Sequence, residues 1–356
     1  MRRRIPGGWR IAARIGCALL AGSPIIAQDA IPPNTVATAI GHEVRIVFEK
    51  CRDAVVKIEA SDEHGDLSGT GFFIDPNGTL YTSYTIGGTS EDITVVCDGQ
   101  RYSAERLIAD PRSGVAILKV DPKIPVPFLS LGHSKALGVG DPIIAIGYPM
   151  DLPVSPSWGT VAGLDIKYLD RYFVTRHLRA GIPVQRGQGG APLLNMGGEV
   201  VGVLISSLDN GSGCFGLPID AAERIHMDYL RHGRLRPGWL GILCAAAPAR
   251  VAGSTAQVEV VTKDSPGSQS GLRPGDILLK VGDNEITSPE DVLNAAFFIA
   301  AEDDVKFKIA RGSEQLEVVV TAADRPTAPR TAGDVPVSVP SAVGSDLRGV
   351  PMKLER

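Results

Sequence analysis

A glycine-rich turn that leads into two apolar strands is the feature that most constrains this chain. Residues 184–195 read V-Q-R-G-Q-G-G-A-P-L-L-N, so the turn passes directly into an apolar run. A second turn at Gly197 and Gly198 is followed by another apolar run, from Glu199 to Ile205. Because glycine lets the backbone approach a ligand closely and point N–H groups into a cleft, we expect a site built from backbone at this turn.

Short apolar runs with turn signals between them indicate a mostly β chain. Segments 68–75 and 79–84 flank a Pro-Asn-Gly turn and predict a hairpin. Further strands are expected at 93–97, 100–102, 115–120 and 142–146. The composition agrees, because the 356 residues include 41 glycines and 26 prolines and only 5% are aromatic. Regularly spaced short strands with almost no helix favour a barrel or a sandwich.

A second unit is expected after the first set of strands. A helix predicted at 220–232 closes the first unit, and Gly233 and Pro237 act as stop signals. The second unit, assigned to residues 236–323, has strand patterns at 257–261, 276–281, 306–310 and 317–321. It also has an amphipathic helix at roughly 289–301, with Ser288 as its cap and Pro289 at its first position.

The two ends of the chain are predicted to lie outside these domains. Residues 1–27 hold five arginines, no acidic residue and a short, interrupted apolar run. That run is shorter than the roughly 20 residues of a membrane span. It predicts a cleaved signal peptide and an exported protein with no span after cleavage; an uncleaved anchor is the alternative. Residues 28–42 are expected to be a polar lead-in, before a short helix at 43–51, and residues 324–356 a flexible tail.

Charge and cysteine content bear on the class of protein. Without the five N-terminal arginines the net charge falls from −4 to about −9, which argues against a nucleic-acid binder. Cys51, Cys97, Cys214 and Cys244 remain after cleavage. Export permits disulfides, but the spacing leaves their pairing open, and buried unpaired cysteines fit equally well. No cluster has metal-ligand spacing, so neither a metal nor another cofactor is expected.

Four segments in combination resemble the HtrA/Deg family of exported serine proteases. They are residues 68–78, 131–149, 187–204 and 238–242, and the resemblance extends over residues 43–323. It implies a trypsin-like double β-barrel, assigned to residues 43–233, followed by a PDZ domain, which is a small α+β fold. It also implies a location in the periplasm or cell envelope.

The family's catalytic side chains are absent from the positions that match. The nucleophile position in the glycine-rich turn holds Gly189, and the run T-S-Y-T-I over residues 82–86 places Thr85 at the histidine position. The run that carries the family's aspartate places Gly114 there. Because the reaction needs a nucleophile, a base and an orienting carboxylate, we predict no peptidase activity. The resemblance leaves the backbone N–H groups of Gly187 and Gly189 as an oxyanion hole.

The remaining histidines and a basic segment offer two further hypotheses. His177 is the nearest to a stand-in base by its place in the family's order, whereas His64 and His133 are expected in an exposed loop and a solvated turn. Basic side chains precede the glycine-rich turn, at Lys167, Arg171, Arg176, Arg179 and Arg186. They are interpreted as a solvated surface, with an anion-binding cleft as the alternative.

The second unit is predicted to bind peptides. Trp239, Leu240, Gly241 and Ile242 resemble the PDZ loop whose N–H groups receive a peptide's C-terminal carboxylate, while the peptide adds as a strand beside residues 242–244. This favours a non-catalytic scaffold, chaperone-like factor or regulator that binds peptide C-termini or unfolded segments, in a homotrimer or beside an active paralogue. An active HtrA-type endopeptidase of envelope quality control with an altered site is the alternative, and a purely structural envelope protein is a third.

Overall fold

The computed structural model describes residues 33–326, apart from 64, 169–170 and 209–210. The predicted signal peptide and nearly all of the predicted tail lie outside the described residues. Within the described ranges, no helix is long and apolar enough to cross a membrane.

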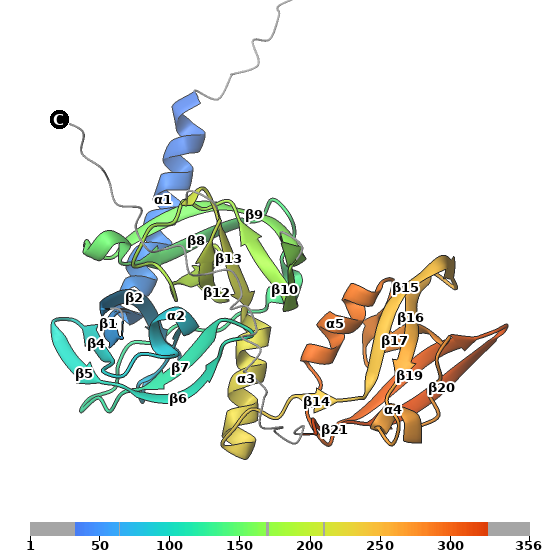
Figure 1. The fold of residues 1–356 in the computed structure, drawn as a ribbon. Helices are drawn as coiled ribbons and strands as arrows, with labels where there is room; N and C mark the ends of the chain where they lie inside the picture. The colour runs from blue at the N-terminus through green and yellow to red at the C-terminus, as the bar shows by residue number, and fades with distance from the viewer. Residues whose placement is uncertain (1–32, 64, 169–170, 209–210, 327–356) are drawn as a thin grey trace, which may run out of the picture. The chain divides into compact units, whose positions relative to one another are not determined.

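The first sheet of the molecule has seven antiparallel strands in the order β5-β4-β1-β2-β3-β7-β6 (Figure 1). Its strands are β1 Val55–Asp62, β2 Gly65–Phe73, β3 Thr79–Ser83, β4 Thr94–Cys97, β5 Gln100–Ser103, β6 Glu105–Asp110 and β7 Val115–Lys119. The expected hairpin is β2–β3. Its turn is closed by the Asp75 carboxylate, which accepts the N–H groups of Asn77 at 2.8 Å and Thr79 at 3.2 Å.

The second sheet is a closed barrel in the order β10-β13-β12-β11-β8-β9. Its strands are β8 Pro142–Gly147, β9 Ser155–Tyr168, β10 Arg171–Ala180, β11 Pro192–Leu194, β12 Val200–Ser207 and β13 Cys214–Pro218. The two longest strands, β9 and β10, were not expected from the sequence. Their charged and glycine residues obscure the alternation, although buried and more exposed positions do alternate along much of β9.

Three α-helices accompany these sheets, which together form the barrel domain. α1 covers Pro33–Cys51, α2 covers Tyr84–Gly87 and α3 covers Ile219–His232. The prediction of a polar lead-in before a helix at 43–51 was wrong, because α1 starts ten positions earlier, with Pro33 as its first residue. α3 ends as expected at Gly233, whose φ of 65° is left-handed. His226 of α3 contacts the buried Tyr81 hydroxyl through Nδ1 at 3.1 Å.

The second domain is a five-strand path, β15-β16-β17-β19-β20, with the short β18 paired to β17. Its elements are β14 Gly238–Trp239, β15 Ile242–Val251, β16 Ser254–Val261, α4 Pro266–Gln269, β17 Ile277–Val281, β18 Asn284–Glu285, α5 Pro289–Phe297, β19 Asp304–Arg311, β20 Glu314–Thr321 and β21 Ala323–Asp324. Asp324 therefore belongs to a strand that pairs with β14, not to the tail. α5 is shorter than predicted. The Asp291 carboxylate caps its start by accepting the Ser288 N–H at 3.1 Å.

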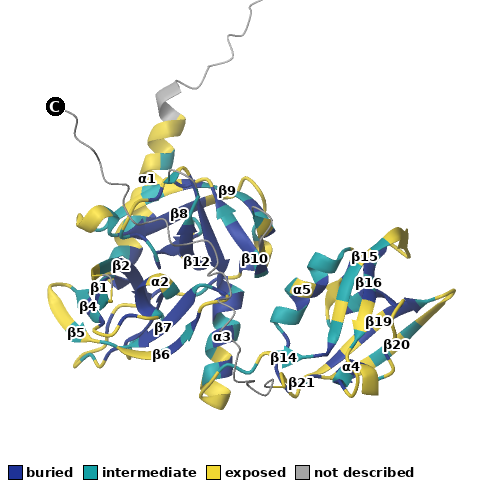
Figure 2. Ribbon diagram, in the orientation of Figure 1, coloured by how far each residue is buried: buried dark blue, intermediate teal, exposed yellow. Residues whose placement is uncertain are grey.

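Each domain has its own apolar core (Figure 2). Phe72, Tyr81 and Phe215 are among the largest fully buried side chains of the barrel domain, and Phe307 is the corresponding one in the second domain. Cys51, Cys97, Cys214 and Cys244 are all free. The cores are therefore held by apolar packing rather than by disulfides between these four cysteines.

Candidate functional site

The glycine-rich turn is fastened on both sides by hydrogen bonds to neighbouring strands. Thr70 of β2 donates its N–H to the Gly189 carbonyl at 2.9 Å and its hydroxyl to the Gly187 carbonyl at 2.7 Å. On the other side, the Gly190 N–H donates to the Leu204 carbonyl of β12 at 2.7 Å. The turn is therefore a rigid part of the domain, and Thr70, which the sequence analysis did not single out, is its main anchor.

The three glycines of the turn have different structural requirements. Gly187 and Gly190 have φ of 90° and 87°, in the left-handed region. A Cβ on them would lie 2.3 Å and 2.2 Å, respectively, from a backbone carbonyl oxygen. Gly189 has an ordinary φ, and a Cβ there would lie 3.2 Å from the Ser83 hydroxyl oxygen. A small side chain thus fits at Gly189 alone, the position where the resemblance places a nucleophile.

The three positions predicted to have lost their catalytic groups lie together. Thr85 is in α2, directly after β3, and the neighbouring Tyr84 N–H donates to the Gly114 carbonyl at 2.7 Å. A Cβ on Gly189 would lie 3.9 Å from the Thr85 hydroxyl oxygen. Ser83, which is buried, lies 2.9 Å from the same hydroxyl. A pair of hydroxyls therefore faces residue 189, where the resemblance places the family's nucleophile.

Gly114 differs from Gly189 because its backbone is in the left-handed region, which residues with a side chain rarely adopt. Its φ is 80°, and a Cβ would lie 3.3 Å from the Ile205 side chain. An aspartate at this position would be strained by φ and crowded by Ile205. The local backbone conformation at residue 114 therefore suits glycine and disfavours a residue with a carboxylate side chain.

His177 does not face the turn as a free base. It lies on β10, is fully buried and stacks on Phe173 with ring centroids 4.2 Å apart. Its Nδ1 is 2.8 Å from the Thr175 carbonyl, and the Ser113 backbone also lies near the ring, although Nε2 makes no well-aligned hydrogen bond within the described residues. Burial lowers the pKa of His177 from 6.5 to about 4, so the ring is neutral at pH 7. The stand-in hypothesis is wrong, because a buried ring cannot take a proton from a bound substrate.

The other histidines serve elsewhere or lie outside the description. His226 is half-buried against Tyr81, and burial lowers its pKa. His133 is highly exposed, as expected, beside Asp220. His42 and His232 are exposed on α1 and α3, and His64 lies outside the described residues. Within the ranges described, no group of three metal-ligating side chains is assembled.

The N–H groups of Gly187 and Gly189 have no acceptor in the described part of the chain. The carbonyls of the same two peptide units, on Arg186 and Gln188, accept backbone N–H groups of the protein at 2.6 Å and 3.0 Å. In a planar trans peptide the C=O and N–H bonds point to opposite sides. The two N–H groups therefore point away from these internal contacts, and both glycines are partly exposed.

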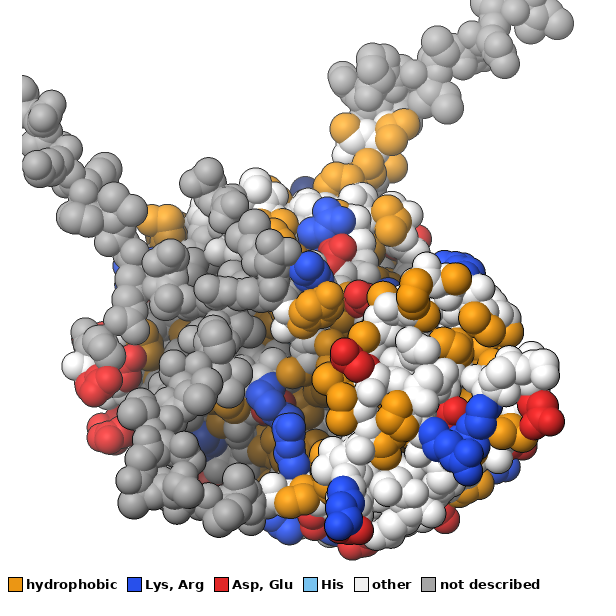
Figure 3. All heavy atoms as spheres, turned by 45° about the vertical axis from the view of Figure 1, so that its right-hand side comes forward, with side chains coloured by type: hydrophobic (Ala, Val, Ile, Leu, Met, Phe, Trp, Pro, Cys, Tyr) orange, Lys and Arg blue, Asp and Glu red, His pale blue; other side chains and the backbone are white. Residues whose placement is uncertain are grey.

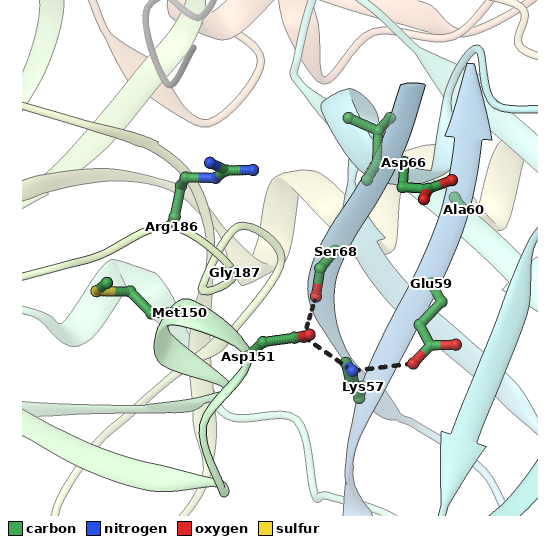
Figure 4. Close-up of a pocket in the computed structure, with 10 residues that line it drawn as sticks. Lys57, Glu59, Ala60, Asp66, Ser68, Met150, Asp151, Arg186 and Gly187 are labelled. Atoms are coloured by element: carbon green, nitrogen blue, oxygen red, sulfur yellow. Dashed lines mark hydrogen bonds and ion pairs between the residues drawn. The ribbon is translucent and has the colours of Figure 1, made fainter. Parts of the chain in front are cut away.

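A polar cavity of about 600 Å³ lies beside the turn, and Arg186 and Gly187 form part of its wall (Figure 4). Lys57 crosses it to Asp151 at 2.8 Å and also contacts Glu59 at 2.9 Å. Ser68 donates a second hydrogen bond to Asp151 at 2.9 Å. The Lys57 and Ser68 bonds lower the pKa of Asp151, so this carboxylate is ionised at neutral pH.

Several of the basic residues before the turn already have a partner among the described residues. Arg179 contacts Asp165 at 2.7 Å, and Arg176 forms an ion pair with Asp291. Lys167 lies over the Tyr172 ring, 5.3 Å from its centroid. Arg186 is different, since its exposed side chain makes no hydrogen bond or ion pair with the described residues. Figure 3 shows acidic and basic side chains scattered among apolar and uncharged ones on the face in view.

The loop before β15 has the same construction as the glycine-rich turn. Gly241 has φ of 72°, and a Cβ on it would lie 2.1 Å from Ser265 Cβ. The Leu240 carbonyl accepts the Gly267 N–H at 2.9 Å, so the Gly241 N–H of the same peptide unit points the other way. That N–H has no acceptor within the described ranges.

A strand edge adjoins this second loop. β15 begins at Ile242 and lies at the end of its sheet, paired only with β16. α5 contacts both β15 and β16. A free edge beside a loop with an unpaired N–H is the geometry that an added peptide strand requires.

Comparisons with known proteins identify both domains. Residues 69–203 match the trypsin-like peptidase domain, and residues 240–321 match the PDZ domain. A probable periplasmic serine endoprotease DegP-like of Halomonas elongata is 30% identical over 285 residues, covering 77% of this chain and 60% of that protein. The Chlamydia pneumoniae protein of the same description is 28% identical, covering 73% and 56%. The chain thus spans about three fifths of the length of these curated relatives.

Solved structures support the fold. The HtrA-type protease AlgW with tripeptide superposes with a TM-score of 0.68 at 20% identity, covering 80% of this chain and 98% of that one. The serine endoprotease from Yersinia pestis gives a TM-score of 0.59 at 22% identity, with coverage of 80% and 98%.

Proposed function

The chain belongs to the HtrA/DegP-type family, and on that premise we propose that it is a non-catalytic member that binds peptide C-termini or unfolded protein segments through its PDZ domain. It is an exported protein of the periplasm or cell envelope, in line with the relatives named periplasmic. Its barrel domain then serves as a scaffold, chaperone-like factor or regulator, alone or beside an active paralogue.

The observation that carries the proposal is the set of groups around Gly189. Acyl transfer needs a nucleophile whose proton is taken by a nearby base. The groups that a Cβ on Gly189 would approach are Ser83, Thr85 and Ile86, and none of these is a base at neutral pH. Loss of triad members lowers the rate by roughly 10⁴-fold or more, so peptide hydrolysis at this turn is expected to be negligible.

Peptide binding is supported by the loop before β15. The unpaired N–H of Gly241 suits a terminal carboxylate, and the free edge of β15 suits the peptide backbone. Ile242 is the first residue of this edge strand, and Leu240 in the loop before it is buried, which fixes the position of the loop. The AlgW structure, whose title includes a bound tripeptide, supports the same ligand class.

An active serine endopeptidase with an altered site is the second candidate. It is favoured by the relatives, which are described as endoproteases and match most of this chain. It requires a nucleophile and a base other than the residues at positions 85, 114 and 189.

Incubation with unfolded casein separates the two candidates. We expect no cleavage above a buffer control and no labelling by a fluorophosphonate probe that reacts with activated serines. Cleavage that coelutes with the protein through repeated purification, together with labelling of this chain, would establish the endopeptidase instead.

A further inference from the structure

We propose that the glycine-rich turn binds the C-terminal carboxylate of a peptide, held by the N–H groups of Gly187 and Gly189 and by the Arg186 guanidinium. The inference rests on the proposed non-catalytic function. In a working peptidase, donors of this kind stabilise negative charge that the reaction creates. Where no reaction creates negative charge, these N–H donors are expected to bind a ligand that is already negatively charged.

The backbone donors are arranged for an anion. The peptide carbonyls on the opposite side of both units are already bonded within the protein, so the N–H groups of Gly187 and Gly189 are left pointing outward. The N–H between them, on Gln188, donates to the Gln185 carbonyl at 3.2 Å, so the free donors are two residues apart. Backbone N–H groups at a turn with a left-handed glycine can form a concave anion site. Gly187 supplies that left-handed residue, with φ of 90°.

The charge of Arg186 is available to a ligand, whereas nearby cations are already paired. Lys57 is held by Asp151 and Glu59, and Arg101 contacts Glu59 at 2.6 Å. The Arg186 side chain extends from the turn toward the strand that carries Ser68 (Figure 4). The guanidinium of the residue before Gly187 adds charged donors to the two backbone N–H groups, and a carboxylate has two oxygens that can accept from both kinds of donor.

Space for the ligand is present on the side of the turn that Arg186 and Gly187 line. On the side of Ser83 and Thr85 the room is small, because a Cβ on Gly189 would lie 3.2 Å from the Ser83 hydroxyl oxygen. The cavity of about 600 Å³ next to Arg186 and Gly187 is large enough for several peptide atoms beyond the carboxylate.

The cavity charges favour a singly charged anion over a phosphate. Besides Lys57 and Arg186, the wall carries three carboxylates, on Glu59, Asp66 and Asp151. Lys57 offsets part of this negative charge, but a doubly charged group would be repelled by the rest. A peptide C-terminus has a single charge and is formed whenever a peptidase cuts a chain.

The test is calorimetric titration of the whole exported chain with the peptide acetyl-Ala-Ala-Ala-Val, compared with its C-terminal amide. We expect the Arg186→Gln variant to lose one carboxylate-dependent site per chain, or to bind there about tenfold more weakly, because a charge-assisted contact is removed. The Arg101→Gln variant is the matched control. It removes an exposed arginine near the same cavity without touching the turn, and it should retain the site.

The outcomes separate this inference from the function on which it rests. Mass spectrometry of the peptide after titration reports cleavage, which would overturn the non-catalytic function. Intact peptide with unchanged binding in the Arg186→Gln variant would overturn only the carboxylate site. Equal binding of the amide at the Arg186-dependent site would also overturn it, because the contact would then not require the charge.

Discussion

Two loops of the molecule have the same backbone construction. They are the glycine-rich turn of the barrel domain and the loop before β15 of the PDZ domain. In each, a left-handed glycine is pressed against neighbouring atoms, at Gly190 and Gly241. In each, peptide carbonyls are bonded inward while N–H groups are left without an internal acceptor. In both loops, therefore, uncharged backbone N–H groups are fixed in positions where they can donate hydrogen bonds to an anion.

Their surroundings differ, so the two proposed sites would hold different lengths of a peptide. The loop before β15 continues into a free strand edge, so it can hold the backbone of a peptide as well as its end. The glycine-rich turn is bounded by β2 and β12 and opens on a charged cavity. On the proposals made above, the backbone donors would bind an anion in both places, and the neighbouring elements would determine how much of the peptide is recognised.

Substitution of Gly190 should have the largest effect, and its neighbour is the control. In Gly190→Ala, the new Cβ meets the Thr70 carbonyl oxygen at 2.2 Å in a left-handed conformation, so the free energy of unfolding should fall by about 3–5 kcal/mol. In Gly189→Ala the closest contact of the new Cβ is the Ser83 hydroxyl oxygen, at 3.2 Å, and the substitution should cost less than about 1 kcal/mol. Urea unfolding of both variants measures this. Equal losses would mean that both glycines are required for backbone reasons.

The Gly189→Ser variant tests whether a nucleophile at residue 189 is enough to restore peptidase activity. The serine fits the space, so the variant should fold like the parent protein. It should still leave casein intact, because Thr85 supplies no base and Gly114 no carboxylate. Cleavage by this single variant would show that another base reaches residue 189.

The PDZ loop should tolerate substitution less well than a glycine of similar φ elsewhere in the domain. Gly241→Ala places a Cβ 2.1 Å from Ser265 Cβ, so we expect a loss of about 3 kcal/mol in stability and at least tenfold weaker binding of the free-carboxylate peptide. Gly312→Ala has φ of 60° and nothing within 4 Å, so it should cost about 1 kcal/mol and leave binding unchanged. If the two variants bound the peptide equally well, the loop before β15 would not be part of the peptide-binding site.

The sequence predicted the short strands and turns better than the long strands. An Asn-Gly turn between apolar runs locates the β2–β3 hairpin because its signal is local. β9 and β10 escaped prediction because their alternation becomes visible only when both faces of the barrel are known. α1 was cut short because Gly41 and nearby polar residues resemble a lead-in, although the helix continues through them.

Within the site, the sequence located the glycine-rich turn but not what supports it. Thr70 anchors the turn by two hydrogen bonds, yet a threonine in a strand carries no signal of that role. The left-handed backbone at Gly114 and the closeness of Ile205, which leaves little room for a side chain there, could be seen only in the structure. Likewise, pairing of Arg176 and Arg179 and the lack of it at Arg186 could be seen only in three dimensions.

Acid should lower the stability of the barrel domain, which carries the glycine-rich turn, more than that of the PDZ domain, because His177 lies in the barrel domain. Its pKa in the folded protein is about 4, below the 6.5 of an exposed ring, so the unfolded chain takes up the proton first as the pH falls. This contribution to stability is complete above pH 6.5 and is lost progressively toward pH 4. Between pH 7 and pH 5 the loss is about 2 kcal/mol.

The matched measurement is hydrogen exchange in β10 and β13 of the barrel domain and in β19 of the PDZ domain. In the parent protein, the protection free energy of β10 and β13 should drop by about 2 kcal/mol more than in His177→Gln between pH 7 and pH 5. The His232→Gln variant, which removes an exposed imidazole, should follow the parent. If His177→Gln kept the full acid sensitivity of β10 and β13, other groups would be responsible. If β19 lost the same His177-dependent protection, the two loops would belong to one cooperative unit.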